Sequence, residues 1–448
     1  MSRALTRREL LAATAALVPA RHWRPHPLPV GVGDRMAWWR EARFGMFLHW
    51  GLYSILAGTW RDDERWAEWI RNNAEIPVEE YDRLVERWDP VAFDPERWAD
   101  LAWRAGMRYI VLTTKHHDGF CLWPSRVGTF DVEATPGRRD ILRDVAAAFR
   151  SRGLRVGWYH SIMDWHHPDY LPRRPWEAAT RPVAGADYAR YVAYLHEQVE
   201  EILTGYAPID ILWFDGQWES TWTHSHALAL QAHIRRLAPD CLVNDRINGS
   251  GRPDGVSLGD FGTPENVIPD TGTPGKDWES CVTMNDNWGY KRQDGNWKTP
   301  RRLVEMLVET VSKGGNLLLN VGPMGDGAFP PEAIARLEAL APWMAVHGDL
   351  LRGSSASRFA DTARFRSTTQ GEVANLFVHD WRPGPLFLEG LAPMPLEAAV
   401  VGADGSRRRL EVQAWDGGVA VILPDVGEPS LLPCVQLRFG GAWGVAAP

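Results

Sequence analysis

The segment 209–217 joins a short apolar run to an acidic residue. Residues 211–214 are typical of a strand that is buried on both faces of a parallel sheet, and Asp215 follows them directly. A carboxylate in that position costs free energy unless it is solvated, paired or used in chemistry. Because barrel enzymes hold their catalytic groups at the carboxyl ends of such strands, Asp215 is the first candidate catalytic residue.

A second carboxyl group is needed if this chemistry is glycoside hydrolysis. That reaction uses one carboxylate as nucleophile or base and one carboxyl group as the acid that protonates the leaving oxygen. The candidates are Glu265 and Glu279, and both lie in the segment 248–299, which is rich in glycine and proline. We expect this segment to be a functional loop, because long loops in compact domains are seldom idle.

Other polar and aromatic residues also stand where predicted strands end. In a barrel these ends face one mouth, and the set combines neutral donors, aromatic faces, a cation and carboxylates. Such a set suits recognition of a polyol ring. Its members are His49 and Trp50, residues 115–118, residues 159–161, Trp213 and Asp215, and Asp245 and Arg246.

Two other chemistries compete with this interpretation. Residues 116–118 and 166–169 are rich in metal ligands, but neither has the His-Glu-x-x-His spacing of a helical zinc site. Adjacent histidines on an extended chain point in opposite directions, so both rarely reach one ion. A Ser-His-Asp hydrolase would need a Gly-x-Ser-x-Gly turn after a strand, and the sequence has none. We therefore expect no metal and no cofactor.

Strand and helix patterns alternate from about residue 34 to residue 347. This alternation indicates parallel βαβ units, and the lack of a glycine-rich dinucleotide or P-loop fingerprint argues against an open sheet. The sequence thus predicts an α/β fold, a (β/α)8-like TIM barrel over residues 30–350, in which some strands are irregular. The expected strands are 43–51, 109–114, 154–161, 211–214, 242–246 and 317–322. The expected helices are 95–106, 140–152, 186–204, 224–237, 301–312 and 330–347.

After about residue 353 the pattern changes to short strands without helix signals. Strands are expected at 374–379, 396–401, 418–423 and 435–439, and Asp-Gly and Gly-Gly turns separate some of them. This texture predicts a C-terminal antiparallel β-sandwich over residues 353–448. The sequence leaves open whether the sandwich binds glycan or only packs on the barrel.

The composition is that of a folded globular protein, with 45% hydrophobic and 24% charged residues in 448. A net charge of −8 without a long basic run argues against nucleic acid as a partner. The four cysteines form no C-x-x-C pair, which argues against a zinc site or a redox dithiol. Tryptophan is abundant, with 24 residues, and flat indole faces suit the C–H faces of sugar rings.

The N-terminus has the pattern of an export signal. Paired arginines, Arg7 and Arg8, precede the short apolar run 10–20, which is typical of a twin-arginine signal peptide over residues 1–25. We therefore expect a secreted or periplasmic protein, with a frayed amphipathic helix as the alternative. The apolar run is too short to span a bilayer, and no other stretch reaches that length, so no membrane span is expected in the mature chain.

Several motifs in order resemble the α-L-fucosidases of glycoside hydrolase family 29. The resemblance covers nearly the whole mature chain. The motifs are residues 44–51 (Phe-Gly-Met-Phe-Leu-His-Trp-Gly), 68–69 (Glu-Trp), 115–120 (Lys-His-His-Asp-Gly-Phe), 157–161 (Gly-Trp-Tyr-His-Ser), 213–216 (Trp-Phe-Asp-Gly), 278–281 (Trp-Glu-Ser-Cys), 288–290 (Trp-Gly-Tyr) and 314–323 (Gly-Gly-Asn-Leu-Leu-Leu-Asn-Val-Gly-Pro).

This resemblance implies retaining hydrolysis of terminal α-L-fucose from glycoconjugates through a covalent fucosyl-enzyme, with Asp215 as the nucleophile. The family's acid/base varies in position. The Thr-Pro-Glu segment resembles that of many members, which favours Glu265, while Glu279 in the Trp-Glu motif is the alternative. The two carboxyl groups of a retaining enzyme should lie about 5–5.5 Å apart. The resemblance places sugar contacts on His49, Glu68, Trp69, His116, His117, Tyr159, Trp213, Arg246 and Trp288.

The expected partner is a fucosylated glycan. Two alternatives stay open: a non-catalytic fucose-binding protein on the same scaffold, and a barrel glycosidase for another sugar. Linkage preference, disulfide pairing and oligomeric state do not follow from the sequence.

Overall fold

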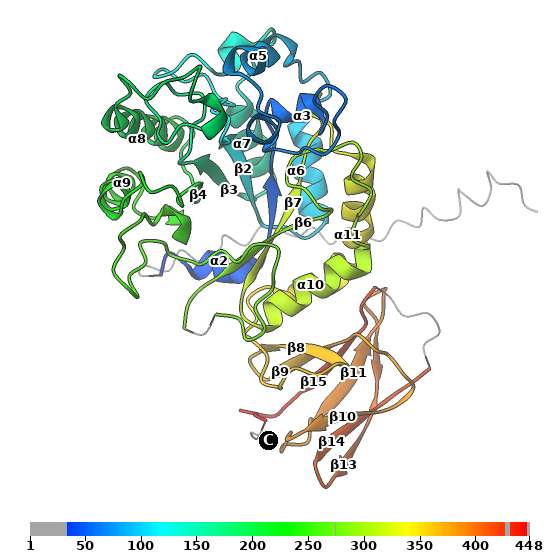
Figure 1. Cartoon of the computed structure of the whole chain (residues 1–448). Helices are drawn as coiled ribbons and strands as arrows, with labels where there is room; N and C mark the ends of the chain where they lie inside the picture. Colours follow the sequence, from blue (N-terminus) through cyan, green and yellow to red (C-terminus); the bar gives the residue numbers. More distant parts are fainter. Residues whose placement is uncertain (1–33, 274, 426–430, 446–448) are drawn as a thin grey trace, which may run out of the picture.

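The computed structural model describes residues 34–273, 275–425 and 431–445. A parallel α/β unit is followed by an antiparallel β unit, drawn in blue to yellow and in orange to red (Figure 1). The predicted signal peptide, residues 1–25, lies outside the described residues. Among the described residues no helix is both long and apolar enough to cross a membrane.

Within the described residues, seven parallel strands form one curled sheet in the order β5-β4-β3-β2-β1-β7-β6. Apart from Arg155, every residue of these strands is buried, because both faces of the sheet are covered. The predicted TIM-like fold class is thus confirmed. The strands are β1 (Phe44–Leu48), β2 (Tyr109–Lys115), β3 (Arg155–Ser161), β4 (Ile211–Asp215), β5 (Leu242–Val243), β6 (Glu279–Thr283) and β7 (Asn316–Val321).

The gap between β5 and β6 is bridged by the irregular segment 260–266. Its Asp260 N–H donates to the carbonyl oxygen of Val243 in β5 over 2.6 Å. On the other side, single parallel bridges join Gly262 to Trp278 and Glu265 to Cys281. Pro264 has no N–H to donate, so this segment cannot form a regular ladder. It occupies the place of the eighth strand and makes one of the irregular strands that the sequence leads us to expect.

The longer helices of the barrel lie outside the sheet, and side-chain caps begin many of them (Figure 1). Asp94, Asp140 and Asp187 each accept a hydrogen bond from a backbone N–H in the first turn of the helix that follows. The predicted helices are confirmed to within a few residues. They are α6 (Pro95–Arg104), α7 (Ile141–Ser151), α8 (Tyr188–Thr204), α9 (His224–Leu237), α10 (Pro300–Ser312) and α11 (Pro331–Leu351).

Short helices were not predicted, and most of them lie in the loops between strands and long helices. Several precede the long helix α6 at the mouth side of β1 (Figure 1). The α-helices among them are α2 (Ala37–Ala42), α3 (Tyr53–Leu56), α4 (Ile70–Asn73) and α5 (Val78–Asp82). The 3₁₀ helices are η1 (Arg83–Arg87), η2 (Val132–Ala134), η3 (Pro175–Glu177) and η4 (Asp245–Ile247).

The C-terminal unit is an antiparallel β-sandwich. Its described residues form a five-stranded sheet, β12-β11-β15-β9-β8, and a three-stranded sheet, β10-β14-β13. Leu376 and Leu437 from the larger sheet share a core with Leu388 and Val421 from the smaller sheet. The strands are β8 (Phe365–Gln370), β9 (Val373–Val378), β10 (Gly384–Glu389), β11 (Glu397–Val401), β12 (Arg407–Arg409), β13 (Glu411–Trp415), β14 (Gly418–Leu423) and β15 (Cys434–Arg438).

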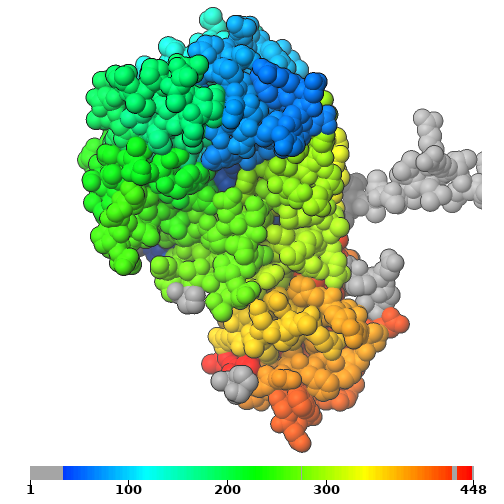
Figure 2. All heavy atoms as spheres, viewed as in Figure 1, coloured from blue at the N-terminus to red at the C-terminus, as the bar shows by residue number. Residues whose placement is uncertain are grey.

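The sandwich packs on α10 and α11, at the end of the barrel opposite to the carboxyl ends of the strands (Figures 1 and 2). Arg43, which precedes β1, donates to the carbonyl oxygen of Ser354 over 2.6 Å. The Trp343 indole on α11 donates to the carbonyl oxygen of Leu432 over 2.8 Å. Phe377 lies in the same apolar cluster as the barrel core. The described residues of the sandwich therefore contact the barrel at the end opposite to its mouth.

Candidate active site

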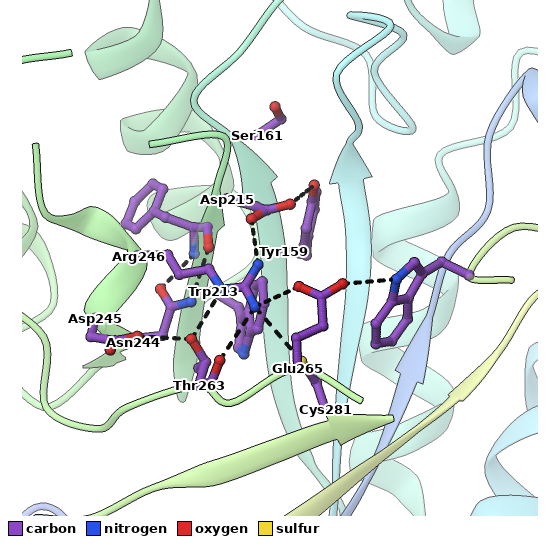
Figure 3. A network of polar contacts seen from close by, with 12 residues as sticks. Tyr159, Ser161, Trp213, Asp215, Asn244, Asp245, Arg246, Thr263, Glu265 and Cys281 are labelled. Atoms are coloured by element: carbon purple, nitrogen blue, oxygen red, sulfur yellow. Dashed lines mark hydrogen bonds and ion pairs between the residues drawn. The ribbon is translucent and has the colours of Figure 1, made fainter. Parts of the chain in front are cut away.

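Part of the predicted strand-end set meets at one mouth of the barrel. Trp50, Lys115 and Asp118 do not join it, because they pack against Trp88, pair with Asp164 and accept from Tyr81, respectively. Asp215 ends β4 beside Tyr159 of β3, and Arg246 reaches Asp215 from η4. Figure 3 shows these side chains converging on one network of polar contacts.

Asp215 is buried and has partners on both carboxylate oxygens. Oδ1 accepts from Arg246 Nη1 at 2.8 Å, and Oδ2 accepts from the Tyr159 hydroxyl at 3.0 Å. The Nε2 atom of His117 lies 3.5 Å from Oδ2. The strand end is fixed as well, because the Asn244 amide donates to the carbonyl oxygen of Phe214 and accepts from its N–H. The carboxylate therefore has a fixed position.

The charge state of Asp215 follows from these contacts. Burial alone would raise the pKa of this carboxyl group, but the hydrogen bond from His117 and the charge of Arg246 outweigh it. They hold the pKa of Asp215 well below its usual range. Asp215 is therefore an anion at neutral pH.

Ser161 fixes the orientation of His117. Its hydroxyl lies 2.6 Å from Nδ1 of His117, while Nε2 faces the Asp215 carboxylate. A carboxylate attracts an N–H and repels a lone pair, so Nε2 carries the hydrogen and Nδ1 accepts from Ser161. The sequence placed Ser161 only among the strand-end residues. No local pattern could have revealed this role, because it depends on a contact between β3 and the residues after β2.

Arg246 joins the two halves of the site. Its Nη1 binds Asp215 and its Nη2 binds Glu265 Oε2, each at 2.8 Å (Figure 3). Nε donates to the Thr263 hydroxyl at 3.0 Å, and the guanidinium lies 4.7 Å from the ring centroid of Trp213. Burial alone would lower the pKa of Arg246, but the nearby Asp215 carboxylate outweighs it and raises the pKa. The guanidinium thus stays charged, and its contacts with Asp215, Glu265 and Thr263 fix its orientation.

Glu265 lies on the irregular segment that closes the barrel. Its Oε1 accepts from the Trp288 indole at 3.1 Å, and its side chain is 43% exposed. The adjacent bridge to Cys281 fixes its backbone, while its carboxylate reaches toward Arg246 (Figure 3). Glu265 is therefore held at its base and accessible at its tip.

Glu279 has the opposite environment, and one expectation about it is wrong. The residue begins β6 and is not part of a loop, since the segment 248–299 contains this buried strand. Its carboxyl group is fully buried. It accepts hydrogen bonds from the Trp213 indole at 3.2 Å and from the Tyr109 hydroxyl. Burial, which outweighs these hydrogen bonds, raises the pKa of Glu279 to about 7.

His116 and His117 also differ from the expected arrangement. Their rings do not point in opposite directions, because the centroids lie 4.2 Å apart. The register between β2 and β3 shifts between Thr113 and Lys115, so the chain no longer alternates as an extended strand does. Burial lowers the pKa of His116 well below its usual value. The Nδ1 atom of His116 has no hydrogen-bond partner among the described residues.

The remaining predicted contacts line the same mouth. His49 binds Asn320 through Nδ1 at 2.8 Å, and burial lowers its pKa to about 4, so it is neutral. Glu68 accepts from the Gly289 N–H at 2.9 Å, and burial raises its pKa. The Trp69 ring lies edge-on to His117 at 5.0 Å. All nine predicted sugar contacts are thus connected through shared neighbours, with the Trp288 ring 5.1 Å from that of His49.

No site suited to a metal ion is present in the part of the chain that the structure describes. No three His, Cys, Asp or Glu side chains gather there as ligands. The cysteines Cys121, Cys241, Cys281 and Cys434 are all free and buried. The side chains at the mouth offer acid, base, hydrogen-bond and aromatic chemistry.

Comparison with known proteins gives consistent matches. The family model described as alpha-L-fucosidase matches residues 21–349. The human tissue alpha-L-fucosidase is 30% identical over 442 residues, which cover 93% of this chain and 90% of that protein. The tissue alpha-L-fucosidase of Macaca fascicularis is 31% identical over 405 residues, covering 85% and 84%.

Solved structures agree with the sequence relatives. The alpha-L-fucosidase isoenzyme 1 from Paenibacillus thiaminolyticus has a TM-score of 0.81 and 38% identity, covering 90% of this chain and 98% of that chain. A GH29 alpha-L-fucosidase from Bacteroides thetaiotaomicron, trapped as a covalent intermediate with 2-fluoro-fucosyl fluoride, has a TM-score of 0.81 and 28% identity. That match covers 90% of this chain and 95% of the other.

Proposed function

The chain belongs to the α-L-fucosidases of glycoside hydrolase family 29. From that premise we propose that it releases terminal α-L-fucose from glycoconjugates with retention. Asp215 is the proposed nucleophile and Glu265 the proposed acid/base. The observation that carries the proposal is Arg246, because neighbouring nitrogens of its one guanidinium bind Asp215 and Glu265. A shared planar group brings the two carboxylates side by side, as a retaining enzyme requires.

In the first step, an oxygen of Asp215 attacks the anomeric carbon while the bond from that carbon to the leaving oxygen breaks. Glu265 donates its proton to the leaving oxygen. In the second step, water attacks the same carbon, Glu265 takes the proton of the water, and the ester bond to Asp215 breaks. The low pKa of Asp215 supports its part, since the nucleophile must be ionised before the sugar binds.

Access favours Glu265 over Glu279 as the acid/base. Glu279 has the raised pKa that a general acid needs, but its carboxyl group is fully buried against Tyr109 and Trp213. A general acid must come within hydrogen-bond reach of the leaving oxygen, so geometry decides before pKa does. The exposed tip of Glu265 meets that requirement.

The walls of the mouth suit fucose. Its hydroxyl groups need donors and acceptors, which the neutral His49, the unpaired Nδ1 of His116 and the Glu68 carboxyl group provide. Its C5 methyl group needs an apolar wall, and the Phe47 ring lies 5.8 Å from Trp288 at this end of the barrel. A retaining α-L-fucosidase that binds the sugar in this pocket explains both features.

The proposal is tested with an aryl α-L-fucoside and azide. Wild-type protein should release the phenol, and Asp215→Ala should lose this activity and regain part of it with azide, giving the β-fucosyl azide. Glu265→Ala with azide should give the α-azide, because its nucleophile is intact. Unchanged hydrolysis by Asp215→Ala would exclude it as nucleophile. Fucose binding in a calorimeter without any turnover by wild type would favour a non-catalytic fucose-binding protein.

We also propose that residues 1–25 export the protein through a twin-arginine pathway. The support is the paired Arg7 and Arg8 ahead of a short apolar run. Cell fractionation should find the wild-type protein outside the cytoplasm, and the double variant Arg7→Lys, Arg8→Lys should be retained inside. Equal export of both proteins would contradict this route.

A further inference from the structure

We infer that the pocket beside Glu265 binds the sugar unit to which fucose is attached, and that the Trp218 indole is the surface on which this unit stacks. The inference rests on the proposed function, since it assigns the leaving-group side of the same site. It names a saccharide, rather than an alkyl chain or a peptide, as the preferred leaving group.

The pocket has the size and position that this role requires. Its volume is about 620 Å³, within the range of roughly 300–1,000 Å³ that is usual for small-molecule sites. Gln217, Trp218, Arg246, Arg252 and Glu265 are among its lining residues. Because Glu265 protonates the leaving oxygen, the group attached to that oxygen must lie on the Glu265 side of the nucleophile. The pocket occupies that side.

Trp218 connects this pocket to the fucose side of the site. Its ring is nearly parallel to that of Trp69, at 6.1 Å and 17°, and the His117 ring meets it edge-on at 5.8 Å. The residue is nevertheless 51% exposed. Half of a large apolar side chain is thus left in water at the edge of the site, and a ligand that covers it would gain the free energy of burying it.

The turn that carries Trp218 is held at several points. Gly216 has φ of 84°, and a side chain there would collide with Met163. Glu219 binds Arg174 at 2.6 Å, and the Trp222 indole donates to the carbonyl oxygen of Ile247 at 2.9 Å. The exposed indole is therefore oriented before a ligand arrives, so little conformational entropy is lost on binding.

Polar groups next to the indole favour a saccharide. The Oε1 atom of Gln217 is buried, and among the described residues it has no hydrogen-bond partner. The Arg252 side chain is exposed and lines the same pocket. An aromatic face flanked by the Gln217 amide and the Arg252 guanidinium matches a sugar ring, which presents C–H groups on its face and hydroxyl groups on its edge. An alkyl chain would use only the indole.

The test compares leaving groups in the full-length enzyme. α-L-Fucosyl fluoride has a leaving group too small to reach Trp218, an aryl fucoside has a flat apolar one, and fucosyllactose has a sugar. We expect Trp218→Ala to lower kcat/KM for fucosyllactose about tenfold or more, mainly through KM, and to change that for fucosyl fluoride less than about twofold. The aryl fucoside should lose less than fucosyllactose. Lactose should inhibit wild-type turnover of fucosyl fluoride more strongly than that of the variant.

The control is Trp415→Ala, which removes another exposed indole, 40% exposed, from the β-sandwich. This variant should leave kcat/KM unchanged for all three substrates. Equal losses for fluoride and fucosyllactose in Trp218→Ala would overturn the inference, since Trp218 would then act on the fucose side. An equal loss for the aryl fucoside would overturn the saccharide preference, and no loss would overturn the site. Wild-type protein that turns over none of the three would instead refute the proposed function. Trp218→Phe, which keeps a smaller aromatic face, should show an intermediate loss if Trp218→Ala is too unstable to assay.

Discussion

Asp215 ends a strand of the regular sheet, whereas Glu265 lies on the irregular segment 260–266 that fills the gap between β5 and β6. The first carboxylate is buried between Arg246, Tyr159 and His117. The second is 43% exposed. Each environment suits one task. A nucleophile must be ionised and fixed against one carbon atom, while an acid/base must change its proton and follow the leaving oxygen.

The regular sheet is rigid because both of its faces are buried. The closing segment is joined to its neighbours by single bridges, since Pro264 has no N–H to donate to a ladder. The nucleophile therefore lies in the rigid sheet, where the covalent bond to the sugar forms, and the acid/base lies on the exposed segment, where protons are exchanged. Substitutions in the regular sheet and in the closing segment should therefore differ in how the loss of activity depends on the leaving group, and not only in the size of the loss.

The largest effect is expected on the regular side. Asp215→Ala should lower kcat/KM for every fucoside about 10⁴-fold or more, whatever the leaving group, because it removes the attacking oxygen. Steady-state assays with a good and a poor leaving group measure this. Asp254→Ala, at an exposed position in the segment between β5 and β6, is the matched control and should keep full activity. A loss limited to poor leaving groups would give Asp215 the acid role and reverse the comparison.

On the irregular side, Glu265→Ala should show a loss that depends on the leaving group. Hydrolysis of a fucosyl sugar should fall about 10²–10⁴-fold, because its oxygen needs a proton to leave. A dinitrophenyl fucoside needs no acid, so its first step should survive and the fucosyl-enzyme should accumulate as a burst of phenol. Rapid mixing would record the burst. Equal losses for both substrates would place Glu265 in binding rather than in proton transfer.

A smaller effect is expected from Ser161→Ala, which acts on Asp215 through His117. Without the hydroxyl donor at Nδ1, the His117 Nε2–H that faces Asp215 is no longer favoured. The pKa of Asp215 should rise, so the acidic limb of kcat/KM should move to higher pH, with a loss of about tenfold at low pH. The pH profile separates this from simple misfolding, which would lower activity at every pH. An unshifted acidic limb would contradict the positioning role.

The sequence predicted the buried strands and the capped helices better than the edge strands and the irregular segment. The apolar run before Asp215 and the capped helices carry local signals, since burial and capping both appear in the residue order. In the sandwich, the predicted strands β9, β11, β14 and β15 lie inside the sheets, whereas the missed strands β8, β10, β12 and β13 are edge strands. Two of these edge strands, β12 and β13, are mostly exposed, so their residues carry little of the apolar signal that marks a strand.

The site shows the same limit. The sequence places Glu279 in a loop, because β6 is only five residues long and is surrounded by glycine and proline. The turned directions of His116 and His117 depend on a register shift against β3, and no single segment records such a shift. Which glutamate is accessible depends on how the barrel closes. Tertiary contacts alone decide that point.

The smallest effect on activity is expected at Glu279, which shares the chemistry of Glu265 but lies in the ordered sheet. Glu279→Gln should change kcat/KM less than about threefold, because glutamine can replace the protonated acid between Tyr109 and Trp213. Its effect should instead appear in stability.

Burial raises the pKa of Glu279 to about 7, from 4.5, so the folded state retains a proton that the unfolded state releases. This contribution is complete below the unfolded pKa and is lost as pH rises through about 7. At about 1.4 kcal/mol per pH unit, it amounts to roughly 3 kcal/mol. Unfolding in urea between about pH 4 and pH 8 should therefore show the variant gaining stability relative to wild type as pH rises. A constant difference, or a loss of activity like that of Glu265→Ala, would mean that Glu279 exchanges protons in catalysis, and the division between a fixed and an accessible side would fail.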